Sequence, residues 1–129
     1  MNVLIVDDHA LFRVGLQGLL ERRGIEIIGT AADGEEGIRL TQELHPDVVL
    51  LDLRMPELGG LSVLRRLADQ GLDVPVVMLT TSADETDLSE ALRNGARGYL
   101  LKDMEPDELI VALQDIVAGK VVVAPGLTG

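Results

Sequence analysis

The chain has 129 residues, the length of one domain, and its apolar share of 47 % excludes a disordered chain. The net charge of −11 argues against direct nucleic-acid binding, and the absence of cysteine excludes disulfides and thiolate metal sites. One Phe, one Tyr and no Trp make the core aliphatic. Without an apolar run of membrane-spanning length or a secretory leader, we expect a soluble, cytoplasmic protein.

Short β-branched runs alternate with amphipathic segments along the chain. The strand-like runs cover residues 3–6, 25–28, 48–51, 74–79 and 99–101. Three of them are apolar throughout, which is typical of parallel strands buried on both faces. Between the runs, apolar residues recur at helical spacing, and the thinnest helical stripe covers residues 34–44. Five repeats of β-α predict an α/β fold, a doubly wound five-stranded parallel sheet with helices on both faces.

The residues at the predicted helix ends support these assignments. Glycines suited to a left-handed C-terminal cap follow four of the helices, at Gly24, Gly71, Gly95 and Gly119. Ser82 and Glu85 fit a capping box, and Pro106 suits the first turn of the last helix.

Polar residues end four of the predicted strands. Asp7 and Asp8 follow the first strand and Asp52 follows the third, while Thr80 and Lys102 follow the fourth and fifth. The carboxyl ends of parallel strands form the usual working edge of such a sheet, so we expect these side chains to converge. Three carboxylates without His or Cys ligands favour Mg²⁺, or Mn²⁺, over zinc. A metal, an ammonium and a hydroxyl around a carboxylate are suited to holding a phosphoryl group.

Taken singly, these residues also have simpler interpretations. An Asp after a strand is commonly a turn former or helix cap, and Tyr99 alone is equally well a strand residue or a switch. His9 could be a metal ligand, although a surface residue in the first turn of a helix is the preferred interpretation. The convergence of five such residues at one edge is what favours a functional site.

The ordered motifs of the chain resemble a response-regulator receiver domain. They are Ile5-Val6-Asp7-Asp8-His9, Leu51-Asp52-Leu53-Arg54-Met55-Pro56 with Gly59-Gly60, Thr80, and Tyr99-Leu100-Leu101-Lys102-Asp103. The run from Gly95 to Asp103 is similar to the nitrate- and nodulation-type (NarL/FixJ-type) subfamily, whose receivers precede a helix-turn-helix domain. The resemblance implies a flavodoxin-like or CheY-like sheet with strand order 2-1-3-4-5.

The resemblance also implies roles for individual residues. Asp52 would be the phosphoacceptor. Mg²⁺ would be held directly by Asp8 and Asp52, through water by Asp7, and by the backbone carbonyl of Arg54. Thr80 would contact a phosphoryl oxygen, Lys102 would pair with the charge, and Tyr99 would change rotamer with Thr80 as the switch. Two positions depart from the family: Asp103 stands where many members have Pro, and Arg54 where Asn is commoner.

Other function classes share parts of this pattern. An aspartate-dependent phosphohydrolase also uses a strand-end Asp and Mg²⁺, but its acid/base carboxylate is replaced here by Arg54. A flavin or nucleotide binder needs a Gly- or Ser/Thr-rich loop where this chain has Asp7-Asp8-His9. A receiver that signals without phosphorylation tends to lose the acidic pocket. We therefore expect a phosphoacceptor switch and not an enzyme in the ordinary sense.

The expected organisation is a receiver over residues 1–118 and the start of a linker over 119–129, because Pro125 and two glycines mark residues 120–129. A helix-turn-helix effector domain outside this sequence is expected to bind DNA. The expected partners are a sensor histidine kinase and, on phosphorylation, a second copy of the protein, with no membrane contact.

Overall fold

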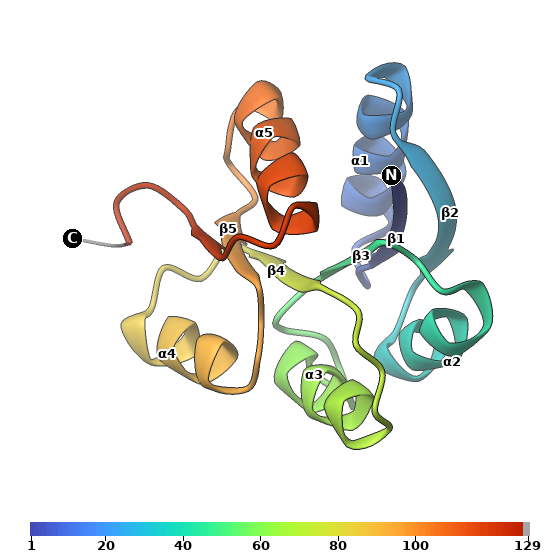
Figure 1. Cartoon of the computed structure of the whole chain (residues 1–129), viewed down its shortest axis with the longest axis vertical. Helices are drawn as coiled ribbons and strands as arrows, with labels where there is room; N and C mark the ends of the chain where they lie inside the picture. The colour runs from blue at the N-terminus through green and yellow to red at the C-terminus, as the bar shows by residue number, and fades with distance from the viewer. Residues whose placement is uncertain (128–129) are drawn as a thin grey trace.

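The computed structural model describes residues 1–127, which form a parallel sheet covered by helices on both faces (Figure 1). The elements in chain order are β1 (Asn2–Val6), α1 (Ala10–Arg22), β2 (Glu26–Ala31), α2 (Gly34–Leu44), β3 (Val48–Leu51), α3 (Gly60–Asp69), β4 (Val76–Thr80), α4 (Glu85–Arg93), β5 (Gly98–Leu101), α5 (Pro106–Val117) and β6 (Val122–Val123). The strand order is β2-β1-β3-β4-β5-β6, and every neighbouring pair is parallel.

The predicted doubly wound sheet and its order 2-1-3-4-5 are confirmed, and one more strand is present. β6 lies beside β5, with the amide of Val122 donating to the Arg97 carbonyl and the amide of Ala124 to the Tyr99 carbonyl. Sequence periodicity could not reveal it, because two residues show no alternation. The β6 residues belong to the segment, 119–129, that was expected to begin a linker. Residues 128–129 of that segment lie outside the described residues.

Two apolar layers hold the helices against the sheet. Side chains alternate between the faces along each strand, so Ile5 and Leu50 pack toward α1 and α5. The helices α2, α3 and α4 cover the opposite face (Figure 1), and Leu51 and Met78 belong to the apolar layer on that side. Tyr99 joins this second layer and is fully buried. None of the helices within residues 1–127 is long and apolar enough to cross a lipid bilayer.

Most of the predicted helix boundaries are confirmed. The four predicted cap glycines have positive φ angles, from 72° at Gly71 to 105° at Gly119, and Pro106 is the first residue of α5. The capping box predicted at Ser82 is wrong. α4 begins at Glu85, and its cap is Asp84, whose carboxylate accepts a hydrogen bond from the Thr86 amide at 2.7 Å.

Candidate functional site

Three carboxylates meet where β1 and β3 end. Val6 pairs with Leu51 in the parallel register of the two strands, so the residues that follow, Asp7 and Asp52, leave the sheet side by side. Both are buried, with 3 % and 4 % of their surface exposed. Together with Asp8 and His9 they place four potential ligand atoms within 4.8 Å of one another. The predicted convergence of the acidic residues is therefore confirmed.

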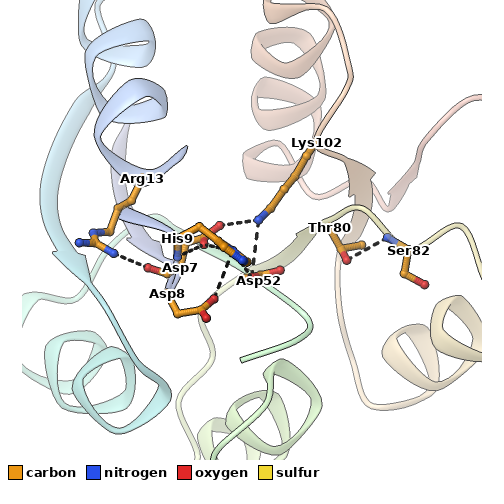
Figure 2. A network of polar contacts seen from close by, with 8 residues as sticks. All are labelled: Asp7, Asp8, His9, Arg13, Asp52, Thr80, Ser82 and Lys102. Carbon is orange, nitrogen blue, oxygen red and sulfur yellow. Dashed lines mark hydrogen bonds and ion pairs between the residues drawn. The ribbon is translucent and has the colours of Figure 1, made fainter. Parts of the chain in front are cut away.

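Lys102 brings a positive charge into this acidic cluster. It follows the last residue of β5, and its side chain is 11 % exposed. Its Nζ atom lies 2.8 Å from Asp7 Oδ2 and 3.6 Å from Asp52 Oδ2 (Figure 2). One ammonium thus neutralises part of the charge of two buried carboxylates. The expectation that Lys102 lies beside the acidic residues is confirmed.

His9 lies closer to the cluster than the sequence interpretation suggested. Its ring is 64 % exposed, in keeping with a residue at the start of α1, yet its Nδ1 atom points inward. Nδ1 lies 3.2 Å from Asp7 Oδ1, 3.3 Å from Asp8 Oδ1 and 3.6 Å from Asp52 Oδ2. The prediction of a surface residue is correct for the outer part of the ring. The inner nitrogen, Nδ1, is one of the four potential metal-ligand atoms.

The acidic cluster has the chemistry of a divalent-cation site. Burial raises the pKa of the Asp52 carboxyl, the Asp7 charge raises it further, and Lys102 opposes both. Two buried oxygens, Asp8 Oδ1 and Asp52 Oδ2, have no partner in hydrogen-bond geometry among residues 1–127. Buried polar atoms are normally satisfied, so carboxylate oxygens without a protein partner in one cluster are suited to be ligands of a hard cation. The residues present therefore suit a metal held by carboxylates.

Gly60 fixes the backbone beneath the phosphoacceptor candidate. The amide of this first α3 residue donates to the Leu53 carbonyl at 2.8 Å. A Cβ atom at position 60 would lie 2.5 Å from the carbonyl oxygen of Asp52. The α3 N-terminus can approach the loop after β3 this closely only because residue 60 is Gly.

Thr80 and Tyr99 are connected through Ser82, a residue that the sequence interpretation assigned only to a helix cap. Thr80 is the buried last residue of β4, and its hydroxyl oxygen accepts from the Ser82 amide at 3.2 Å. The Tyr99 hydroxyl donates to the Ser82 carbonyl at 2.9 Å, and the Ser82 hydroxyl donates to Asp87 on α4 at 2.6 Å. Ser82 thereby ties both residues to α4.

The Arg54 side chain forms an ion pair with Asp87 on α4. Its side chain is 69 % exposed. Its guanidinium thus connects the loop after β3 to α4.

The structure brings all five predicted strand-end residues to one edge of the sheet. Asp7, Asp8 and Asp52 form the acidic cluster, and Lys102 contacts two of its carboxylates. Thr80 lies at the same edge, facing Ser82 (Figure 2).

Known proteins share both the sequence pattern and the fold. The family model of the response regulator receiver domain matches residues 3–114. The nitrate/nitrite response regulator protein NarL of Escherichia coli K12 is 42 % identical over 128 residues, covering 98 % of this chain and 59 % of that protein. The transcriptional regulatory protein LnrK of Bacillus subtilis 168 is 40 % identical over 129 residues, covering 99 % of this chain and 59 % of that protein.

The solved structures agree with these relatives. The crystal structure of a LuxR-family two-component response regulator from Aurantimonas sp. SI85-9A1 superposes with a TM-score of 0.93 at 33 % identity, covering 98 % of this chain and 91 % of that one. The chain spans about three fifths of the length of the curated relatives that it matches. The chain therefore belongs to the response regulator receiver domain family and, within it, to the NarL/FixJ type.

Proposed function

We propose that this receiver domain accepts a phosphoryl group on Asp52 from the phosphohistidine of a sensor histidine kinase. The single observation that carries the proposal is the environment of Asp52. Within the described part of the chain, one oxygen of its buried carboxylate has no hydrogen-bond partner. This oxygen lies 3.6 Å from the Lys102 ammonium and beside two further carboxylates.

In the proposed reaction, a carboxylate oxygen of Asp52 attacks the phosphorus atom. A new O–P bond forms while the N–P bond to the kinase histidine breaks, and the imidazole nitrogen leaves with the electron pair. Lys102 supplies positive charge where charge develops on the phosphoryl oxygens, and its burial strengthens that interaction. Asp7 holds Lys102 through the 2.8 Å contact and so keeps the ammonium at the site.

The acidic cluster would hold Mg²⁺, or Mn²⁺, through Asp7, Asp8 and Asp52 together with the backbone carbonyl of Arg54. The unpartnered oxygens of Asp8 and Asp52 support this assignment. When bound, the ion neutralises charge on the transferred phosphoryl group. To leave room for such an ion, the His9 ring, which is 64 % exposed, would turn toward solvent.

Phosphorylation adds a charge of about −1.5 to −2 beside β4 and β5. We propose that Thr80 then turns its hydroxyl toward the phosphoryl group, which requires its bond to the Ser82 amide to change. Because Tyr99 binds the same residue, the change reaches α4 and the surface formed by α4, β5 and α5.

The proposed output is control of transcription. LnrK is a transcriptional regulatory protein and NarL is a nitrate/nitrite response regulator, each longer than this chain. We therefore propose that residues 1–118 act as the receiver of a longer regulator. Residues 119–129 would lead into a linker and a helix-turn-helix DNA-binding domain, and phosphorylation would promote a homodimer.

Intact-mass spectrometry with acetyl phosphate as donor tests the proposal. The wild type should gain the mass of one phosphoryl group in the presence of Mg²⁺, and Asp52→Asn should gain none. Asp69→Asn, which removes an exposed carboxylate on α3, is the matched control and should label like the wild type. Labelling of both wild type and Asp52→Asn would refute the proposal. So would absence of labelling under conditions that phosphorylate another receiver.

A further inference from the structure

We infer that Phe12 is a positioning residue for phosphoryl transfer, because the face of its ring holds the Lys102 ammonium at the acidic cluster. The inference rests on the proposed function and extends it to a residue outside the acidic cluster. Phe12 is the only Phe of the chain, and it lies in the first turn of α1, three residues after His9.

The geometry is that of a cation–π contact. The Nζ atom of Lys102 lies 4.4 Å from the centroid of the Phe12 ring. The same atom contacts Asp7 at 2.8 Å and faces Asp52 at 3.6 Å. The ammonium is thus bounded by carboxylates and by an aromatic face, whose negative quadrupole attracts a cation most strongly where water is excluded.

The Phe12 ring limits the motion of the Lys102 side chain, which otherwise has space to move. A cavity of about 260 Å³ opens between α1 and α5, and both Phe12 and Lys102 line it. Its other walls are apolar, with Leu16 from α1 and Leu109 from α5 among them. A lysine has four flexible methylene groups, so without the ring the ammonium would be free to swing along this opening toward water.

The position of the ammonium matters for the rate of transfer. A cation held in place before the reaction stabilises the developing charge without having to be ordered during it. The usual strength of a partly buried cation–π contact corresponds to a change of about three- to tenfold in an equilibrium or rate constant. Loss of the ring face should therefore slow phosphorylation by that factor.

Phe12 also packs against the apolar layer of α1 and α5, so a structural role must be separated from a positioning role. Phe12→Leu removes the ring and keeps apolar bulk, whereas Phe12→Tyr keeps the ring face. Leu16→Val is the matched control, since it trims the same cavity from the same helix. Phe12→Leu in a Lys102→Met background shows whether the effect passes through the ammonium.

The first measurement is the rate of labelling by acetyl phosphate at saturating Mg²⁺. We expect Phe12→Leu to slow labelling about three- to tenfold. Phe12→Tyr and Leu16→Val should stay within about twofold of the wild type. In the Lys102→Met background, Phe12→Leu should cause no further slowing. A wild-type rate for Phe12→Leu, or equal slowing in both backgrounds, would overturn the inference.

The second measurement needs no phosphorylation. In the wild type, the ring current of Phe12 should displace the NMR signals of the Lys102 ε-methylene protons to high field. The displacement should disappear in Phe12→Leu and persist in Leu16→Val. Unchanged Lys102 signals in Phe12→Leu would overturn the inference. If the wild type takes up no phosphoryl group, the proposed function fails, and the NMR comparison alone decides whether Phe12 holds Lys102.

Discussion

Replacing Asp52 by Asn should stabilise the metal-free domain. The ligand atoms of the cluster lie within 4.8 Å of one another, and at that limit two like charges repel by roughly 3.5 kcal/mol at an effective dielectric constant of about 20. Lys102, 3.6 Å from Asp52, attracts it by roughly 4.6 kcal/mol on the same scale. Because Asp52 faces two carboxylates and one ammonium, the repulsion wins by about 2 kcal/mol. For a domain of this size that gain corresponds to about 6–10 °C in Tm.

The gain should depend on pH in a defined direction. The pKa of Asp52 is raised from its ordinary value of 3.8, first by burial and then by Asp7, so the folded protein takes up this proton more readily than the unfolded chain. The charged carboxyl therefore reduces stability at neutral pH, and the reduction fades as the pH falls through the raised pKa toward 3.8. The advantage of Asp52→Asn should shrink over the same interval.

Thermal and urea unfolding in EDTA, followed by circular dichroism at several pH values, measure this difference. Asp69→Asn removes one negative charge from an exposed position on α3 and controls for the change in net charge. Its effect should be small and nearly independent of pH. A clear loss of stability in Asp52→Asn at neutral pH would refute the electrostatic reasoning, as would an advantage that grows with acidification.

Two further changes test the cluster and its backbone support. The wild-type Tm should rise with millimolar Mg²⁺ by mass action, and Asp8→Asn should abolish most of that rise; a wild-type Tm insensitive to Mg²⁺ would contradict the metal site. Gly60→Ala should destabilise the domain by about 1–3 kcal/mol in urea titrations, because its Cβ would meet the Asp52 carbonyl oxygen at 2.5 Å. Wild-type stability of Gly60→Ala would contradict this prediction, because it would show that the loop after β3 moves away from the added Cβ at little cost.

The fold and the acidic cluster could be predicted because they follow from local rules. Buried parallel strands appear as apolar runs, and the edge at which they end is fixed by their common direction. Asp7, Asp52 and Lys102 could thus be placed together from their positions after three strands. No side-chain conformation was needed for that step.

The remaining contacts depend on side-chain direction and on distant pairings. His9 is largely exposed, and only its rotamer places Nδ1 among the carboxylates. Phe12 belongs to the apolar stripe of α1, and this pattern predicts that its ring is buried but does not predict that Lys102 contacts the ring. The hydrogen bond from Ser82 to Asp87 could not be predicted, because the sequence pattern assigns Ser82 to the N-cap of α4. In the structure Asp84 is the N-cap, and the Ser82 hydroxyl binds Asp87 instead.

The aromatic composition makes the domain its own spectroscopic reporter. Tyr99 is the only Tyr, and the chain has no Trp, so its ultraviolet emission comes from the single side chain that binds the Ser82 carbonyl. Its phenol is buried against the α4 side of the sheet, and burial raises its pKa. Any rearrangement that exposes the ring would change its emission and its quenching by iodide. The state of the β4–α4 connection can thus be followed in the unlabelled protein.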